Sequence, residues 1–151
     1  VCSSDLSQDR IVELITPTEP VMVLVDPRRI QRIIRNLVTN AIDHRGDKSV
    51  VVKIEGTNNE VAVGVRDFGD GLTEEDSRRV FDRFWRKDPA RTRTRGSSGL
   101  GLSIAKEDAE LHHGELEVWS RPSQGANFVL TIPRNPGGVI QSKPLSVIPE
   151  I

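Results

Sequence analysis

Residue types that build disulfides and zinc sites are scarce in this chain of 151 residues. Its one cysteine, Cys2, permits no internal disulfide and fits a reducing compartment. None of the three histidines, which are His44, His112 and His113, has metal-ligand spacing with a cysteine. The sequence therefore argues against both a disulfide framework and a zinc site.

Long apolar runs and a strong charge of one sign are also missing. No run approaches the length of a membrane span, and no secretory leader is visible. The formal net charge of −1 argues against a general nucleic-acid binder, which would be strongly basic. We therefore expect one globular domain with a buried core, without nucleic acid as a partner and without direct membrane contact.

Apolar periodicity and helix-ending residues predict the secondary structure. Asp26 is a typical helix N-cap with Pro27 at the first helical position, and Gly114 is a helix stop. Helices are predicted over residues 27–45, 73–81 and 100–113, and strands over 21–25, 50–55, 60–66, 115–120 and 127–132. This order predicts an α/β (α+β) two-layer sandwich, with a mixed, largely antiparallel sheet covered on one face by helices.

The two ends of the chain differ in composition from the middle. Residues 1–10 are predicted to be a leader segment that precedes the folded domain. The opening VCSSDL of this segment resembles a translated sequencing-adapter remnant, which would make it artefactual. The alternative is an ordinary frayed terminus. Residues 11–133 are predicted to be the folded domain. Residues 134–151 contain Pro, Gly and Ser and are predicted to be a flexible tail.

Three polar residues follow one another at helical spacing in the stretch NLVTNAIDH. Positions four apart lie on one side of a helix, so Asn36, Asn40 and His44 form a row. Asparagine is a poor helix former, and its amide oxygen suits a hard cation such as Mg²⁺. The alternative is a pair of half-buried amides that hydrogen-bond to neighbouring backbone.

Two glycine-containing stretches are further candidates. In DFGDG, Asp67 lies at a strand end and is suited to accept a hydrogen bond from an exocyclic amine, such as that of adenine. The alternative is a strand that ends in an ordinary Asp-Gly turn. GSSGLGL leads into a helix whose N-terminal amides favour an anion, unless it is only a linker. It is neither a Walker loop nor a dinucleotide fingerprint. Between them, FDRFWR precedes an arginine-rich loop, which is either a phosphate-neutralising lid or a solvated charged segment.

In this order and spacing, NLVTNAIDH, DFGDGL, FDRFWR and GSSGLGL resemble the N, first glycine, F and second glycine boxes of bacterial sensor histidine kinases. These boxes belong to the catalytic ATP-binding domain (HATPase) of the gyrase–Hsp90–kinase–MutL (GHKL) superfamily, which has the Bergerat fold. The resemblance covers roughly residues 20–133 and is strongest to the actinobacterial MtrB type. It implies ATP and Mg²⁺ as ligands.

The resemblance also implies a role for individual residues. Asn40 matches the asparagine that ligates Mg²⁺, Asn36 the one a turn before it, and Asp67 the aspartate that reads the adenine amine. Phe81 and Phe84 match the F box, and residues 86–98 the ATP lid, in which Ser97 replaces the usual glycine. The other residues implied to bind the nucleotide are Asp43, His44, Gly69, Gly71, Phe84, Arg86, Lys87, Ser98, Gly99, Leu100 and Gly101.

The resemblance finally implies a reaction and partners. In superfamily members that hydrolyse ATP, a glutamate base stands in place of Asn36, and an amide cannot take a proton at neutral pH. Transfer to a histidine of a separate dimerisation domain of the parent kinase is therefore expected, followed by a response regulator. We expect this domain in the cytoplasm and the parent protein in the cell membrane. The alternatives are an anti-sigma-factor-type serine kinase and a nucleotide-gated interaction module.

Overall fold

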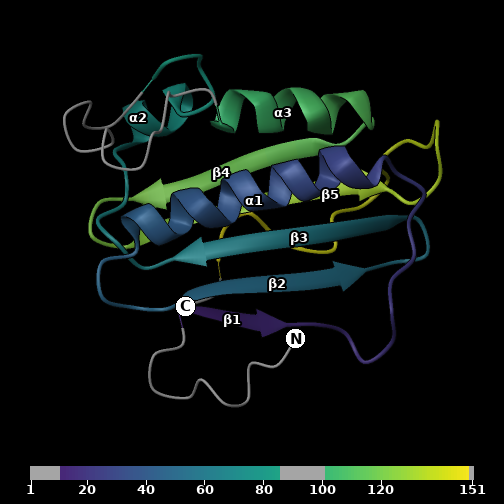
Figure 1. Cartoon of the computed structure of the whole chain (residues 1–151), viewed down its shortest axis with the longest axis horizontal. Helices are drawn as coiled ribbons and strands as arrows, with labels where there is room; N and C mark the ends of the chain where they lie inside the picture. Colours follow the sequence, from purple (N-terminus) through teal and green to yellow (C-terminus); the bar gives the residue numbers. More distant parts are fainter. Residues whose placement is uncertain (1–10, 86–100, 150–151) are drawn as a thin grey trace.

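The computed structural model describes residues 11–85 and 101–149, in which five strands form one sheet (Figure 1). The strands are β1 (Val12–Ile15), β2 (Val50–Gly56), β3 (Glu60–Asp67), β4 (Glu115–Arg121) and β5 (Gly125–Pro133). Their order across the sheet is β1-β2-β3-β5-β4. Because β1 runs parallel to β2 and the other pairs are antiparallel, the predicted mixed, largely antiparallel sheet is confirmed.

The longest helix is α1 (Pro27–His44), and its limits follow from its sequence. The Asp26 carboxylate accepts a hydrogen bond from the backbone N–H of Arg28 at 3.0 Å, which satisfies one of the free donors of the first turn. The apolar stripe of the helix faces the sheet, with Ile33, Leu37 and Ala41 all 0% exposed. The predicted helix is therefore confirmed at both ends.

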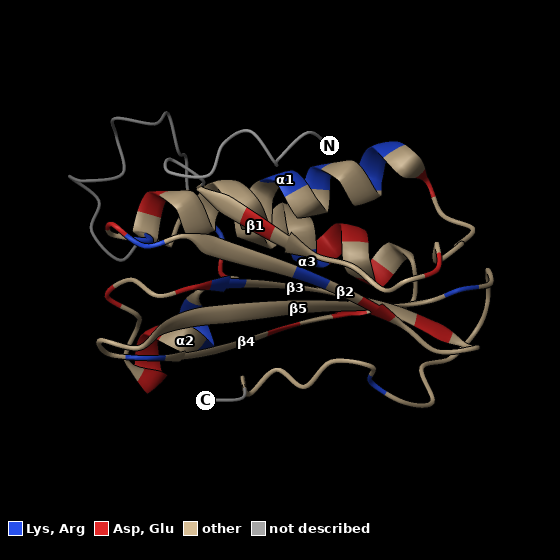
Figure 2. Ribbon diagram, turned by 90° about the horizontal axis from the view of Figure 1, so that it is seen from below, with Lys and Arg blue, Asp and Glu red and all other residues tan. Residues whose placement is uncertain are grey.

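Two helices cover the same face of the sheet. Figure 2 shows α1 beside α3 (Gly101–Leu111) on one side of the strands. A short helix, α2 (Glu74–Arg79), is capped by Thr73 and contacts β4. The buried side chains between helices and sheet include Ile33, Leu37, Val50, Val65, Phe128 and Leu130. This layering confirms the predicted fold class.

The predicted strand at residues 21–25 is wrong, and β1 takes its place in the sheet. The segment 21–25 alternates between half-buried and exposed side chains, as a strand does, but it is not assigned to the sheet. Its backbone bonds to Arg134, whose carbonyl accepts from Leu24 N–H at 3.0 Å. Val23 and Val25 pack against the core, so the apolar pattern reports burial rather than strand pairing. At four residues, β1 is short for a sequence signal.

The segment after Pro133, for which a flexible tail is predicted, lies along the sheet face opposite the helices (Figure 2). Glu60 is 0% exposed there and accepts hydrogen bonds from Gln141 N–H at 2.7 Å and from the Ser142 hydroxyl at 3.0 Å. Farther along, the Asn127 amide donates to the Val147 carbonyl at 2.9 Å. The composition reads as a tail because this attachment is made by scattered polar and charged contacts, such as that of Lys143 with Glu117, rather than by a periodic apolar stripe.

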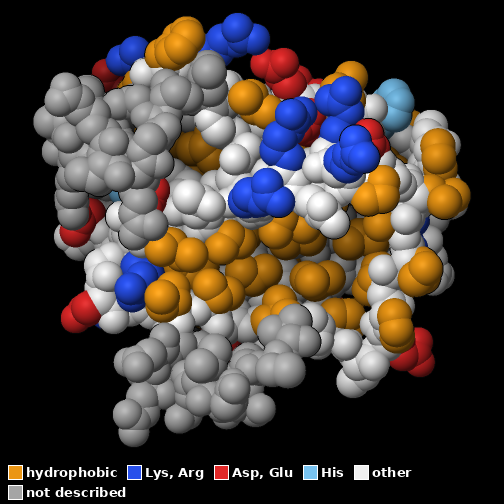
Figure 3. Space-filling model, in the orientation of Figure 1, with side chains coloured by type: hydrophobic (Ala, Val, Ile, Leu, Met, Phe, Trp, Pro, Cys, Tyr) orange, Lys and Arg blue, Asp and Glu red, His pale blue; other side chains and the backbone are white. Residues whose placement is uncertain are grey.

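Hydrophobic side chains gather on the helix-bearing face beside α1 (Figure 3). A cavity of about 450 Å³ opens there, between residues 16–21 and Val23, Ile30 and Ile34 of α1, and apolar residues of β2, β3 and β5. The residues that line it include none of the predicted site residues. Among the helices of residues 11–85 and 101–149, none is long and apolar enough to cross a membrane.

Substituting Glu60→Gln should loosen the C-terminal segment in a pH-dependent way. The N–H of Gln141, followed by the Thr57 hydroxyl, holds the pKa of the Glu60 carboxyl below its usual range. Such a carboxylate stabilises the folded state at neutral pH, and this contribution is lost as the pH falls through the lowered folded pKa. We expect the variant to melt below the unchanged protein at pH 7, with the difference closing in acid. Glu13→Gln, at an exposed site on β1, is the control; a deficit that is constant with pH would contradict the assignment.

Candidate functional site

The last turns of α1 bring the predicted polar row to one end of the sheet. Asn36, Asn40, Asp43 and His44 are all half-buried there, beside the stripe that contacts the core. The Asn36 amide Nδ2 donates a hydrogen bond to the carbonyl of Gly101 at 3.0 Å. Since Gly101 is the first residue of α3, the polar row of α1 and the second glycine stretch are in direct contact.

The end of β3 meets the end of α1. Asp67 is only 2% exposed, and its carboxylate Oδ1 accepts a hydrogen bond from Gly69 N–H at 3.0 Å. A Cβ added at Gly69 would lie 1.5 Å from the His44 carbonyl oxygen. Only glycine therefore lets this loop pack against the helix end, and the contact places Asp67 on the same side of the sheet as the polar row.

A serine and a glycine outside the predicted site hold the DFGDG loop from the other side. The hydroxyl of Ser120, which is 0% exposed, accepts from Leu72 N–H at 2.8 Å and donates to the Gly125 carbonyl at 2.6 Å. Gly125 has a φ of +80°, and a Cβ there would lie 2.1 Å from the Asp67 carbonyl oxygen. Within the loop itself, Gly71 has a φ of +72°, and a Cβ there would lie 1.9 Å from the Arg121 carbonyl oxygen. Sequence reasoning missed both supports, because neither Ser120 nor Gly125 lies in one of the predicted motifs.

Arg66 is a third support that the sequence did not reveal. Its guanidinium donates to the carbonyls of Asp67 and Gln124, each at 2.8 Å, and lies 4.4 Å from the centre of the Phe68 ring. Burial lowers the pKa of Arg66, yet an arginine remains charged in a protein. This charged group therefore ties the end of β3 to the β4–β5 turn, next to Asp67.

The two phenylalanines of the F box are placed differently. Phe81 is half-buried and meets Phe128 edge-on, with ring centres 6.0 Å apart, so it anchors this segment to the core. Phe84 is 68% exposed and has a φ of 64°. The structure therefore does not pack Phe84 into the part of the site that contains Asn36 and Asp67. Five other predicted site residues lie outside the described residues: Arg86, Lys87 and Ser98 of the F box and lid, and Gly99 and Leu100 of the second glycine box.

The part of the site that is described thus combines three separate stretches of sequence around the C-terminal half of α1. The family described as histidine kinase-, DNA gyrase B- and HSP90-like ATPase matches residues 25–136, which contain all three. The chain belongs to this ATPase family. Individual relatives show which branch of the family the chain resembles.

Those relatives are sensor histidine kinases. The chain is 46% identical to the sensor histidine kinase MtrB of Mycobacterium tuberculosis, over 95% of this chain and 26% of the relative. It is 43% identical to the histidine-protein kinase AfsQ2 of Streptomyces coelicolor, over 74% and 21%. The catalytic domain of histidine kinase ThkA has the same fold, with a TM-score of 0.71 and 26% identity, over 89% of this chain and 88% of that one. The predicted MtrB-type resemblance is confirmed.

The chain aligns with only part of each full-length relative. The chain spans about a quarter of MtrB and about a fifth of AfsQ2, but nearly the whole of the ThkA catalytic domain. It therefore corresponds to the catalytic domain of a sensor histidine kinase.

Substituting Gly69→Ala should disrupt the contact between the DFGDG loop and α1. The added methyl group would meet the His44 carbonyl, so the loop or the helix end must move, and overpacking of this kind costs about 1–3 kcal/mol. Denaturant unfolding would measure the loss.

Gly101→Ala is the matched control, because a Cβ there would lie 3.6 Å from the Asn36 side chain, which is ordinary contact. Its unfolding free energy should change by less than about 1 kcal/mol. Equal losses in the two variants would show that the close approach at Gly69 has no special weight.

Proposed function

We propose that this domain binds Mg-ATP and donates the γ-phosphoryl group to a histidine on a separate dimerisation domain of its parent sensor kinase. The observation that supports this most directly is the meeting of three stretches at α1, with Asn36 bonded to Gly101 and Gly69 packed on His44. One acidic acceptor, a row of carboxamides and a helix N-terminus are the groups that a purine triphosphate requires.

Asp67 is the proposed reader of the adenine ring. Its carboxylate is almost fully buried and fixed by Gly69 N–H, while Arg66 and Ser120 hold the surrounding loop. A buried, preorganised acceptor favours a base with an exocyclic amine, because a base without it leaves the acceptor unpaired. Gly69 and Gly71 give the loop its close backbone packing beside that acceptor.

Asn36, Asn40 and Gly101 form the proposed phosphate end of the site. Their chemistry fits magnesium, since Asn40 presents a neutral amide oxygen and Mg²⁺ takes few protein ligands beside phosphate and water. Magnesium, when bound, neutralises charge on the phosphates. The N-terminus of α3 at Gly101 adds backbone N–H groups and a favourable helix dipole. We assign Asp43, His44, Phe84, Arg86, Lys87, Ser98, Gly99 and Leu100 to the same site by family resemblance.

The proposed reaction is a phosphoryl transfer rather than hydrolysis. The bond between the γ-phosphorus and the bridging oxygen breaks, ADP leaves with that oxygen, and a bond forms from phosphorus to a nitrogen of the acceptor imidazole. The displaced imidazole proton passes to solvent. Asn36 is an amide and cannot deprotonate water, so the domain holds and orients the reactants without activating a competing nucleophile.

The rest of the parent protein is proposed on the same grounds. Residues 11–133 would be the ATP-binding domain. The acceptor histidine would lie on a dimerisation domain, and a response regulator would take the phosphoryl group next. The parent would be anchored in the cell membrane with this domain in the cytoplasm, as we expect for a sensor kinase.

Removing either end of the proposed site should abolish nucleotide binding. Asn40→Ala removes an amide oxygen from the magnesium end, and Asp67→Asn replaces the acceptor with an amide that can present its donor side. We expect each to raise the dissociation constant for Mg-ATP at least about 10-fold, measured by calorimetry. Thr39→Ala, at the exposed position next to Asn40, is the control and should bind as the unchanged domain does. Unchanged affinity in both site variants would refute the assignment.

Transfer to histidine makes a prediction that separates the proposed kinase from a serine kinase. With labelled ATP and the dimerisation domain of the parent added in trans, label should appear on that domain and be lost in acid, because a phosphoramidate hydrolyses there. Acid-stable label would indicate a serine phosphate. Tight Mg-ATP binding without any transfer in the full-length parent would indicate an interaction module instead.

A further inference from the structure

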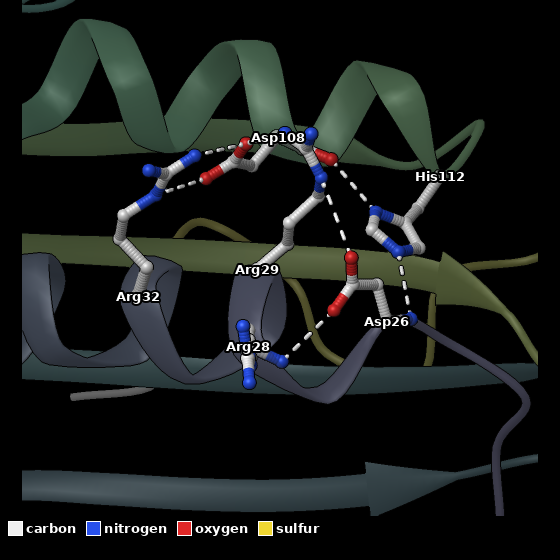
Figure 4. A network of polar contacts seen from close by, with 6 residues as sticks. All are labelled: Asp26, Arg28, Arg29, Arg32, Asp108 and His112. Carbon is white, nitrogen blue, oxygen red and sulfur yellow. Dashed lines mark hydrogen bonds and ion pairs between the residues drawn. The ribbon is translucent and has the colours of Figure 1, made fainter.

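Helices α1 and α3 lie side by side and antiparallel, joined by polar contacts at three levels. At the first level Asn36 bonds to Gly101, and at the second Arg32 and Arg29 bond to Asp108. At the third level Asp26 bonds to His112. The residue number thus falls along α1 as it rises along α3, which shows that the helices are antiparallel. We call the second and third levels the α1–α3 clamp, which is formed by Asp26, Arg29, Arg32, Asp108 and His112 (Figure 4). The first level, between Asn36 and Gly101, belongs to the proposed phosphate end of the site.

Asp108 is the centre of the clamp. It is 1% exposed, and its carboxylate accepts two hydrogen bonds from Arg32, at 2.8 and 2.9 Å, and one from Arg29 at 2.9 Å. The Arg32 hydrogen bonds, more than the one from Arg29, hold the pKa of the Asp108 carboxyl below its usual range. A two-pronged contact between a planar guanidinium and a carboxylate fixes direction as well as distance.

His112 closes the clamp at the far end. The N–H of Asp26 donates to its Nε2 at 3.1 Å, and its Nδ1 lies 2.9 Å from the Asp108 carbonyl. Because Nε2 accepts a hydrogen bond, the proton of this neutral imidazole sits on Nδ1 and donates to that carbonyl. The N-cap residue of α1 is thus bonded to the residue that follows α3, which in turn bonds to the last turn of α3.

The apolar contacts of α3 need such a clamp to define its position along α1. Two of the fully buried side chains of α3 are Ala105 and Ala109, whose single methyl groups offer little to interlock with a neighbouring element. Small residues let helices approach closely but give weak resistance to sliding along the axis. Directional bonds to Asp108 supply that resistance, and α3 is rigid over the roughly 10 Å from Asp108 to Gly101.

We propose that Asp108 is a positioning residue for the phosphate end of the nucleotide site, acting through the register of α3 against α1. This inference rests on the proposed function. If the register shifts, Gly101 and the first amides of α3 move relative to Asn36 and Asn40, which would hold the magnesium and phosphates. Asp108 itself lies about two turns from Gly101 and does not contact the nucleotide.

The adenine end of the site is held by other elements, which makes the proposal testable. Asp67 and its loop are fixed by Arg66, Ser120 and the end of α1. A general loss of folding would weaken binding of both ends of the nucleotide. A shift of α3 would weaken binding of the triphosphate alone, so comparing two ligands distinguishes the two cases.

The experiment compares Mg-ATP with adenosine on Asp108→Asn, with binding followed by NMR titration. Losing the charge-assisted bonds should raise the dissociation constant for Mg-ATP about 10-fold and that for adenosine by less than about twofold. Arg32→Met, which alters the α1 side of the same contact at a half-exposed position, should give the same split. The double variant should lose no more than the worse single one, because both remove one interaction.

Glu107→Gln is the matched control: it neutralises the adjacent carboxylate of α3, which is exposed and contacts Arg83 rather than the clamp. It should bind both ligands as the unchanged domain does. Equal losses for Mg-ATP and adenosine in Asp108→Asn, or no loss for either, would overturn the positioning role. Failure of the unchanged domain to bind Mg-ATP would instead overturn the proposed function.

Discussion

The burial of one face of α1 against the sheet is the interaction on which the other contacts of this domain depend. Ile33, Leu37 and Ala41 lie on that face, and removing such side chains from water stabilises a helix far more than its own hydrogen bonds do. Once that stripe is packed against the sheet, the half-buried Asn36 and Asn40 lie beside it at a fixed position relative to the strands. The polar row is therefore positioned by apolar packing.

Each part of the candidate site is then attached to α1 by a different kind of contact. The DFGDG loop is attached sterically, through the missing side chain of Gly69, whereas α3 is attached by hydrogen bonds to Asn36 and to the arginines. Steric contacts vary steeply with distance, whereas the bonds to Asp108 of α3 come from the long, half-exposed side chains of Arg29 and Arg32. This difference predicts that the phosphate end is easier to perturb than the adenine end, and it gives Asp108 its proposed importance.

Much of the fold could be predicted because its signals are local. The cap at Asp26 and the strand patterns of β2 to β5 each depend on neighbouring residues, and these elements were confirmed. The predicted stop was displaced: α3 ends at Leu111, and the left-handed residue after it is His113 rather than Gly114. The strand expected at 21–25 failed because alternation reports which side chains are buried, not which backbone groups are paired. The attachment of the segment after Pro133 through Glu60 was missed for a different reason: a charged strand residue gives no sign that it is buried.

By itself, the sequence determined the family and the candidate residues, because box order and residue type are properties of the chain alone. Only the tertiary structure decided how those boxes are supported: by Ser120, Arg66 and Gly125 beneath Asp67, and by Asp108 between the helices. Ser120 and Asp108 bond to residues 48 to 79 positions away in the sequence, and Arg66 bonds to main-chain carbonyls. Such contacts arise only once the strands and helices are packed, which is why no local pattern encodes them.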